Sequence, residues 1–268
     1  TMQWTDLCAW TFERLARSGF GRSDFEECLA RIPWFPENLE AVRFVGTLAA
    51  ANDRATEGGA EDKAVKVQQC IISDANTEFI DTILKAKGIS NLFRSKSCSN
   101  NNTTAGFDSL GPSIFTNPAR WEPLPPLEDS KPSDTGAQEV LRVEWLQPRG
   151  RPHNCPWSPK NMCKGDILDA FVAECIRSGS QDNNGDTDNF DARTVIYIGD
   201  GRGDLSAVLR MTANDHVLAR KDFPLMKALT SDPQVIPLIK ATVHPWADGA
   251  ELFSLLQQLM PNPRAADL

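Results

Sequence analysis

Two aspartates lie in a glycine-rich stretch directly after a short apolar run. Residues 195–198 are typical of a buried strand, residues 199–201 read Gly-Asp-Gly, and Asp204 comes four residues after Asp200. Carboxylates at the tip of a strand suit a hard, oxygen-ligated cation such as Mg²⁺. A dinucleotide-binding loop fits less well, because the glycine spacing differs and Asp200 would repel a pyrophosphate. The remaining alternative is a structural glycine turn with two capping aspartates.

Ser73 is a candidate phosphate-binding residue. It follows an apolar segment, residues 65–72, that is predicted to be a strand, and it precedes a helix predicted over residues 77–87. A hydroxyl group between a strand end and a helix N-terminus is well placed to donate a hydrogen bond to a phosphate oxygen. The alternative is that Ser73 only caps the helix that follows.

Lys164 lies in the first turn of a helix predicted over residues 161–177. A cation at this position opposes the helix dipole, so it indicates a nearby anion, and a lysine can neutralise phosphate as a point charge. A solvated surface lysine is the alternative. His153, Cys155 and Cys163 lie close to it in sequence, but their spacing matches no closed four-ligand zinc site.

The elements that would position these residues alternate between strands and helices. Strands are predicted over residues 65–72, 195–198 and 215–219, and helices over residues 1–31, 37–50, 77–87, 161–177, 223–230 and 247–260. This alternation predicts an α/β fold with a mainly parallel sheet. Ligands bind such sheets beyond the carboxyl ends of the strands, where Ser73 and Asp200 both fall. Residues 97–140 are rich in Asn, Ser, Pro and Asp, which predicts mostly loop.

The composition is that of a globular chain with an acidic balance. A net charge of −8 argues against nucleic acid as the main partner, because phosphate backbones require a basic surface. The seven cysteines are scattered and odd in number, which favours a reduced, cytoplasmic compartment over a disulfide framework. No run approaches the roughly 18 apolar residues of a membrane span, so no membrane partner is expected. Targeting and oligomeric state are not indicated by these residues.

Three segments, taken in chain order, resemble motifs II, III and IV of the haloacid-dehalogenase (HAD) phosphatases. They are Ile-Ser-Asp-Ala-Asn at residues 72–76, Asn-Met-Cys-Lys-Gly at 161–165 and Tyr-Ile-Gly-Asp-Gly at 197–201. These motif sequences are similar to those of the PHOSPHO-type branch, which includes phosphoethanolamine/phosphocholine phosphatases, a pyridoxal-phosphate phosphatase and plant relatives. The resemblance spans nearly the whole chain, interrupted by polar insertions near residues 51–64, 99–145 and 178–191.

The resemblance implies a fold, a reaction and a cofactor. The expected fold is a HAD-like Rossmannoid parallel-sheet core over residues 34–268, with residues 1–33 as the remnant of a small helical cap. The expected activity is Mg²⁺-dependent hydrolysis of a phosphate monoester through an aspartyl-phosphate. The expected substrate is a small phosphorylated metabolite of the phosphoethanolamine/phosphocholine or pyridoxal phosphate class.

The same resemblance assigns roles to individual residues. Asp200 and Asp204 are predicted metal ligands, and Asp204 is also counted with the catalytic residues Ser73 and Lys164. The predicted substrate-binding residues are Ser73, Asp74, Asn76 and Lys164. Asp74 is a candidate partner for a substrate ammonium group, with capping of the following helix as the alternative.

One part of the family pattern is missing from these 268 residues. Family members begin with an apolar strand ending in Asp-x-Asp-x-Thr, whose first aspartate is phosphorylated during turnover. Here an Asp-x-Asp occurs at residues 186–188, inside a polar insertion. Cys155 also lacks the close N-terminal cysteine partner that the family has. We therefore expect a fragment without the nucleophile. The alternative is a catalytically inactive pseudoenzyme, or a phosphate-binding interaction protein on the same fold.

Overall fold

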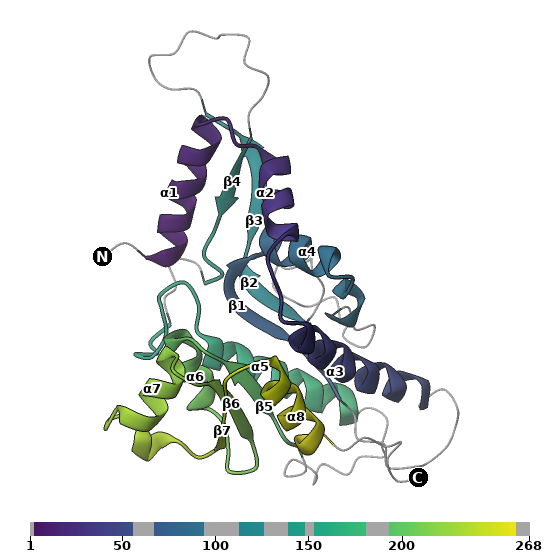
Figure 1. Ribbon diagram of the computed structural model, residues 1–268. Helices are drawn as coiled ribbons and strands as arrows, with labels where there is room; N and C mark the ends of the chain where they lie inside the picture. The colour runs from purple at the N-terminus through teal and green to yellow at the C-terminus, as the bar shows by residue number, and fades with distance from the viewer. Residues whose placement is uncertain are drawn as a thin grey trace. The chain divides into compact units, whose positions relative to one another are not determined.

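The computed structural model describes residues 3–55, 67–93, 113–125, 139–147, 153–180 and 193–260 (Figure 1). The chain divides into two compact units. The first comprises Thr1–Pro33, Ile71–His153 and Pro159–Met162, and the second comprises Trp34–Cys70, Asn154–Ser158 and Cys163–Leu268. One boundary falls after residue 33, and the functional division into cap and core stays a prediction.

Aromatic side chains join the helices of the first unit. Its helices are α1 (Trp4–Arg17), α2 (Arg22–Ala30), α4 (Thr77–Ala86) and the short 3-10 helix η1 (Ser90–Phe93). The ring centroid of Phe25 lies 5.5 Å from that of Phe12 and 6.3 Å from that of Phe79. Trp121 packs edge-on against Phe25 at 5.4 Å. Each such pair adds about 0.5–1.5 kcal/mol beyond the area it buries, so this cluster holds the three α-helices to the strand that carries Trp121.

The strands of the first unit form two small sheets. β1 (Ile71–Asn76) runs parallel to β2 (Ile114–Asn117), and β3 (Ala119–Pro123) runs antiparallel to β4 (Glu139–Val143). Helix α1 lies alongside β4 (Figure 1). The prediction that residues 97–140 are mostly loop is wrong for β2 and β3 and for the start of β4, and these three strands fall within the polar insertion expected near residues 99–145. Val140 and Leu141 are adjacent and both buried, so β4 lacks the alternation by which strands are recognised.

A parallel three-stranded sheet forms the centre of the second unit. Its strands are β5 (Ile196–Gly199), β6 (His216–Arg220) and β7 (Thr242–Trp246), in the order β5-β6-β7. Residues 217–219 of β6 are fully buried, as expected for the central strand of a parallel sheet. β7 was not predicted, because His244 and Pro245 interrupt its apolar pattern. The carboxyl ends of all three strands lie along one edge of this sheet.

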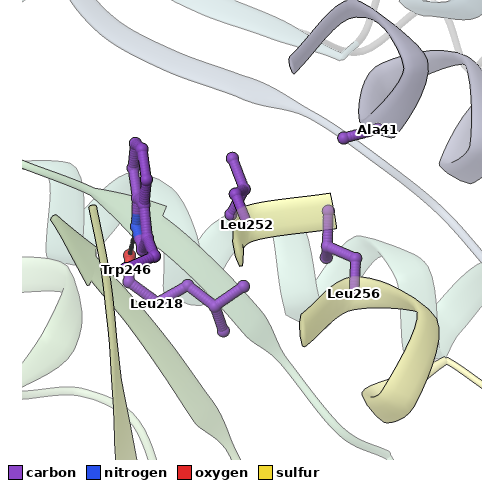
Figure 2. Close-up of a cluster of buried hydrophobic side chains, with 5 residues drawn as sticks. All are labelled: Ala41, Leu218, Trp246, Leu252 and Leu256. Carbon is purple, nitrogen blue, oxygen red and sulfur yellow. Dashed lines mark hydrogen bonds between the residues drawn. The ribbon is translucent and has the colours of Figure 1, made fainter. Parts of the chain in front are cut away.

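The second unit also contains helices, two of which contact strands of this sheet. The helices are α3 (Pro36–Ala55), α5 (Lys164–Ser180), α6 (Leu205–Val208), α7 (Pro224–Ser231) and α8 (Gly249–Leu259), with the 3-10 helices η4 (Arg202–Asp204) and η5 (Ile236–Leu238). Ala41 of α3 and the α8 residues Leu252 and Leu256 form one buried cluster with Leu218 and Trp246 (Figure 2). Trp246 Nε1 donates to the carbonyl of Leu218 at 3.1 Å. Truncating a buried leucine of this kind to alanine costs about 2–5 kcal/mol.

The predicted α/β class with parallel sheets is confirmed, and the architecture agrees with a HAD-like Rossmannoid fold. The predicted helices at residues 77–87, 161–177, 223–230 and 247–260 all occur, with ends within three residues of those expected. β1 begins later than the predicted strand at residues 65–72. The predicted insertions near 51–64 and 178–191 lie mostly outside the described residues, which end at residue 55 in the first and at residue 180 in the second. Among those described, no helix is both long and apolar enough to cross a membrane.

Candidate functional site

Asp200 lies at the carboxyl end of β5, where parallel sheets bind ligands. Its side chain is exposed, and no residue in the described part of the chain pairs with its carboxylate. The backbone around it is fixed, because its carbonyl accepts from the N–H of Leu225 at 2.9 Å. Its own N–H donates to Asp204 Oδ2 at 3.1 Å. A free carboxylate on a fixed backbone is suited to binding a cation.

Asp204 has the opposite character, since it is buried and both of its carboxylate oxygens accept hydrogen bonds. Oδ1 accepts from Lys164 Nζ at 2.6 Å and from the Tyr197 hydroxyl at 2.9 Å. Oδ2 accepts from the backbone N–H groups of Asp200 and of Gly201, at 3.1 and 2.9 Å. Four donors compensate the burial of this charge. The arrangement supports a role in organising the turn, and metal ligation by Asp204 stays a prediction.

Lys164 is the first residue of α5, and its side chain is only 12% exposed. The alternative of a solvated surface lysine is therefore wrong. The anion that its position at the helix N-terminus requires is present, at least in part, as the carboxylate of Asp204. An ammonium group has three protons to donate, and one described partner leaves two for an incoming anion.

Gly199 and Gly165 allow the close approaches on which this ion pair depends. A Cβ atom at Gly199 would lie 2.8 Å from Asp204 Oδ2, so a larger residue would push the carboxylate out of its place. At Gly165, a Cβ atom would lie 2.5 Å from the backbone oxygen of Ser206. Glycine at these two positions brings the end of β5 and the start of α5 against the segment that carries Asp204 and Ser206.

Tyr197 is a member of this site that the sequence reasoning did not identify. Its side chain is buried in β5, and burial raises its pKa well above the ordinary value, with the charge of Asp204 adding to the shift. It therefore acts as a neutral hydrogen-bond donor to Asp204. The available signal was that Tyr197 is the single tyrosine of the chain and lies within a recognised motif.

Ser73 and Asp74 lie near the carboxyl end of β1, where the pairing register with β2 has a bulge or irregularity, which we call the bulge of β1. The register with β2 shifts between Ser73 and Asn76, and bulges of this kind are frequent next to active sites. Ser73 Oγ accepts from the N–H of Ala75 at 3.2 Å. Among the described residues its own hydroxyl proton has no acceptor. The hydroxyl proton is therefore not committed to a described acceptor, and phosphate binding by Ser73 stays a prediction.

Two buried asparagines hold this bulge, and neither was predicted as a site residue. Asn117 Nδ2 donates to the carbonyls of Asp74 and Ala75, at 2.9 Å each. Asn161 Nδ2 donates to the carboxylate of Asp74 and to Asn117 Oδ1, and Asn161 Oδ1 accepts from Gln3 Nε2 at 2.6 Å. Asn161 opens a recognised motif and could have been found there. Nothing in the sequence distinguishes Asn117 from the many polar residues before it.

Asn76 caps helix α4, because its Oδ1 accepts from the N–H of Phe79 at 3.0 Å. The alternatives in which Ser73 or Asp74 caps this helix are therefore wrong. Asn76 is also buried, and its side-chain amide nitrogen has no partner in the described ranges. Its predicted substrate contact stays a prediction that would depend on this nitrogen.

The predicted site residues fall into two groups. Lys164, Asp200 and Asp204 come together in the second unit, whereas the predicted residues of β1 belong to the first. No group of three or more His, Cys, Asp or Glu side chains suited to a metal ion occurs in the described ranges. Mg²⁺ usually takes one or two carboxylates and fills its other positions with phosphate and water. The free carboxylate of Asp200 fits that donor set.

Comparisons with known proteins agree with the motifs. A family model described as Putative Phosphatase matches residues 1–260. "Inorganic pyrophosphatase 2" of Arabidopsis thaliana is 28% identical over 97% of this chain and 71% of its own length. "Pyridoxal phosphate phosphatase PHOSPHO2" of Bos taurus is 24% identical over 96% of this chain and 81% of its own length.

A "Thiamine phosphate phosphatase-like protein" of Arabidopsis thaliana is 27% identical over 97% of this chain and 81% of its own length. No solved structure gave a significant match. The relatives named here carry phosphatase or pyrophosphatase names, which agrees with the resemblance to PHOSPHO-type phosphatases seen in the three motifs.

Proposed function

The chain belongs to the Putative Phosphatase family, and on that basis we propose that it serves Mg²⁺-dependent hydrolysis of a small phosphorylated metabolite. The observation that carries this proposal is at the carboxyl end of β5. There the buried Lys164–Asp204 ion pair, 2.6 Å between Nζ and Oδ1, lies next to a backbone that presents the free carboxylate of Asp200. This combination offers one fixed cation and one metal ligand.

Lys164 is the group that would hold the transferred phosphoryl oxygens. Asp204 accepts one hydrogen bond from this ammonium group and so fixes its position before substrate binds. The other two protons of the ammonium group are then oriented for donation to a phosphate. A preorganised cation stabilises the charge of a phosphoryl group without reorganisation during the reaction. Ser73, in the first unit, stays a predicted phosphate-binding residue, since its hydroxyl proton has no acceptor among the described residues.

Asp200 is the residue that would hold Mg²⁺. When bound, this ion would reduce the charge repulsion between an anionic nucleophile and the phosphate. Asp200 would contribute one negative oxygen ligand. Asp204 would keep the turn of residues 200–204 in place by accepting the backbone N–H groups of Asp200 and Gly201.

The attacking carboxylate is the missing part of this proposal. In an aspartyl-phosphate mechanism, the carboxylate attacks phosphorus, the alcohol leaves, and water then hydrolyses the acyl phosphate. These 268 residues contain no apolar strand that ends in Asp-x-Asp-x-Thr. We place the nucleophile on a segment outside these residues. The same observation favours a second candidate, a protein that binds a phosphorylated ligand without hydrolysing it.

For the substrate we propose a phosphate monoester of the phosphoethanolamine/phosphocholine or pyridoxal phosphate class. Asp74 Oδ1 is held by Asn161, which fixes the carboxylate in the bulge of β1. A carboxylate held in this way could read an ammonium group on the leaving group. The names of two relatives include pyridoxal phosphate and thiamine phosphate, which favours an aromatic phosphate, whereas another relative is named for inorganic pyrophosphate.

Hydrolysis of p-nitrophenyl phosphate with and without Mg²⁺ tests the proposal. The 268-residue chain alone is expected to show background rates. The chain expressed together with the genomic sequence upstream of Thr1 is expected to show Mg²⁺-dependent turnover. Rapid turnover by the 268 residues alone would contradict the assignment of the nucleophile. Inactivity of the extended chain on every phosphate monoester would favour the non-catalytic candidate.

A further inference from the structure

Gln3 occupies the N-cap position of helix α1, yet its side chain makes no capping hydrogen bond. Glutamine is not among the residue types favoured at this position, which are short polar residues and glycine. The side chain extends instead to Asn161, whose Oδ1 accepts from Gln3 Nε2 at 2.6 Å across 158 positions of sequence. Helix capping therefore does not explain Gln3, whereas its bond to Asn161 gives it a partner within the first unit.

The orientation of the Asn161 amide follows from partners that cannot exchange donor for acceptor. Asn117 Nδ2 donates to two backbone carbonyls and its Oδ1 accepts from a backbone N–H, so the Asn117 amide has one possible orientation. The same Oδ1 accepts from Asn161 Nδ2 at 3.2 Å, and the second proton of Asn161 Nδ2 goes to Asp74 Oδ1. Oδ1 of Asn161 therefore faces Gln3, where a hydrogen-bond donor is required.

Asp74 is held through one of its two carboxylate oxygens. The residue is half-buried, and Oδ1 accepts from Asn161. Within the described ranges, Oδ2 has no hydrogen-bond partner. The backbone carbonyl of Asp74 accepts from Asn117 Nδ2 at 2.9 Å. Because the main chain and one oxygen are held, the direction of Oδ2 depends on the Asn161 amide and, through it, on Gln3.

A second residue of α1 lies within electrostatic reach of the same carboxylate. Burial raises the pKa of the Cys8 thiol, and the negative charge of Asp74 adds to this rise. The thiol and the Gln3 amide both belong to the first part of α1. This end of the helix therefore lies close to Asp74.

Two further hydrogen bonds fasten α1 to the segment around β4. Trp145 Nε1 donates to Asp6 Oδ1 at 2.9 Å, in the first turn of the helix. An Arg142 nitrogen donates to Glu13 Oε2, also at 2.9 Å, further along it. The helix that carries Gln3 is thus held in place by contacts that do not involve Asn161.

We propose that Gln3 is a positioning residue for substrate selection, which directs the Asp74 carboxylate toward the leaving group through the Asn161 amide. Without the Gln3 donor, Asn161 Oδ1 has no partner and the amide is free to turn, which releases Asp74 Oδ1. A charge-assisted hydrogen bond from substrate needs the carboxylate in one direction. This inference rests on the proposed function, and it assigns part of leaving-group recognition to helix α1.

A double-mutant cycle tests the inference in the chain expressed with the genomic sequence upstream of Thr1. The changes are Gln3→Met, which keeps an unbranched stem and removes the donor, Asp74→Asn, and both together. Gln3→Ala is a second form of the first change. The matched control is Glu13→Gln, which weakens the attachment of α1 to β4 and leaves the contact with Asn161 intact. The substrates are phosphoethanolamine and propyl phosphate, in which a methyl group replaces the ammonium group.

Both Gln3 variants should lower the ratio of kcat/KM for phosphoethanolamine to kcat/KM for propyl phosphate by roughly 3- to 10-fold, within the range for coupled neighbours. The kcat for propyl phosphate should stay within about 2-fold of wild type, which a general loosening of the fold would not allow. In the Asp74→Asn background, the Gln3 change should alter the ratio by less than about 2-fold, because the carboxylate it positions is absent. Glu13→Gln should leave the ratio unchanged.

The unfolding midpoint of each variant shows whether it is folded, and either folded Gln3 variant decides the result. Equal losses on both substrates, an unchanged ratio, or a Gln3 effect that persists in the Asp74→Asn background would overturn the inference. The proposed function would stand in each of these cases, because hydrolysis itself continues. Failure of the folded wild-type chain to hydrolyse any phosphate monoester would count against both.

Discussion

The strand ends that carry the predicted residues are stabilised in different ways in the two units. At the end of β5, one buried carboxylate, Asp204, collects a lysine, a tyrosine and two backbone N–H groups. At the end of β1, the buried amides of Asn117 and Asn161 bind backbone carbonyls and the carboxylate of Asp74. The first arrangement is ionic and the second is mostly neutral.

The difference separates residues that hold the structure from residues that are free to react. In each region a buried side chain makes all or most of the hydrogen bonds it can make. A neighbouring side chain still has a donor or acceptor without a described partner. Asp204 is saturated and Asp200 is free, while Asn117 is engaged and the Ser73 hydroxyl proton has no described acceptor. Substitutions of the two kinds should therefore separate stability from activity.

The largest effect on stability is expected from Asp204→Asn. This change leaves the Lys164 ammonium group in a site that is only 12% exposed, without its carboxylate partner. Breaking a buried ion pair at one partner costs about 3–5 kcal/mol. Urea denaturation followed by circular dichroism measures the loss. The matched control is Asp200→Asn, which should change stability by less than about 0.5 kcal/mol because its carboxylate is exposed and has no partner among the described residues. Equal losses for both variants would contradict the division of roles.

A smaller loss is expected from Asn117→Ala at the end of β1. The change leaves two part-buried carbonyls and the N–H of Leu146 without the amide that binds them. Each unsatisfied buried group costs about 1–3 kcal/mol, and relaxation of the bulge should hold the total near about 2–3 kcal/mol. The same denaturation experiment applies, with the exposed Asn91→Ala as control. A loss no greater than that of the control would show that the amide network is dispensable.

The sequence predicted these two regions unequally well. Helices α4 and α8 were found because their apolar residues recur at helical spacing, and strand β5 because it is a short apolar run that ends in Gly-Asp-Gly. The β3–β4 pair was missed because its strands are short and adjacent residues of β4 are both buried. Strand β7 was missed because polar and proline residues break its pattern.

The site shows the same limit. Lys164 and Asp200 could be identified because a lysine opposing a helix dipole, and an aspartate between glycines at a strand end, are unusual without a ligand. Asn117 could not be identified, because its role depends on partners that only folding brings near, whereas Tyr197 could have been found as the single tyrosine of the chain within a recognised motif. Asn117 meets Asn161 across 44 positions of sequence, and no local pattern records that contact.

Asp74→Asn tests how the β1 end contributes to substrate choice. If Asp74 reads an ammonium group, the variant should lose about 1–3 kcal/mol of selectivity for phosphoethanolamine over a neutral phosphate monoester. The measurement is kcat/KM on both substrates, with the chain extended by its upstream sequence. Equal losses on both substrates would exclude amine recognition by Asp74.

The smallest effect is expected on the pH dependence of stability, from the histidine pair on β6 and β7, which belongs to neither of the two strand-end regions. His216 Nδ1 lies 3.0 Å from His244 Nε2, and burial, followed by the charge of His216, lowers the pKa of His244. The folded state therefore binds protons less readily than the unfolded state. Stability from this site is fully present above the unfolded pKa near 6.5 and decreases as pH falls through that value.

His244→Gln removes this titration. Unfolding midpoints measured between about pH 7.5 and 5 should fall less steeply for His244→Gln than for wild type, because the unfolded chain then gains one proton fewer. His216→Gln should also reduce the slope, since it removes the second cause of the shift. A slope for His244→Gln as steep as that of wild type would show that the pair does not contribute to acid sensitivity.

The most direct test of the account is the activity of Asp200→Asn in the chain extended by its upstream sequence. An amide cannot supply the negative oxygen that a carboxylate gives to Mg²⁺. Substituting a residue that contacts only the ligands of a metal lowers activity by roughly 10–100-fold. Asp200→Asn should lower the rate of hydrolysis by more than that, while its unfolding midpoint stays at the wild-type value. Hydrolysis of p-nitrophenyl phosphate at saturating Mg²⁺, with denaturation of the same sample, gives both numbers. Wild-type activity in a folded Asp200→Asn variant would show that the free carboxylate at the end of β5 is not the metal ligand.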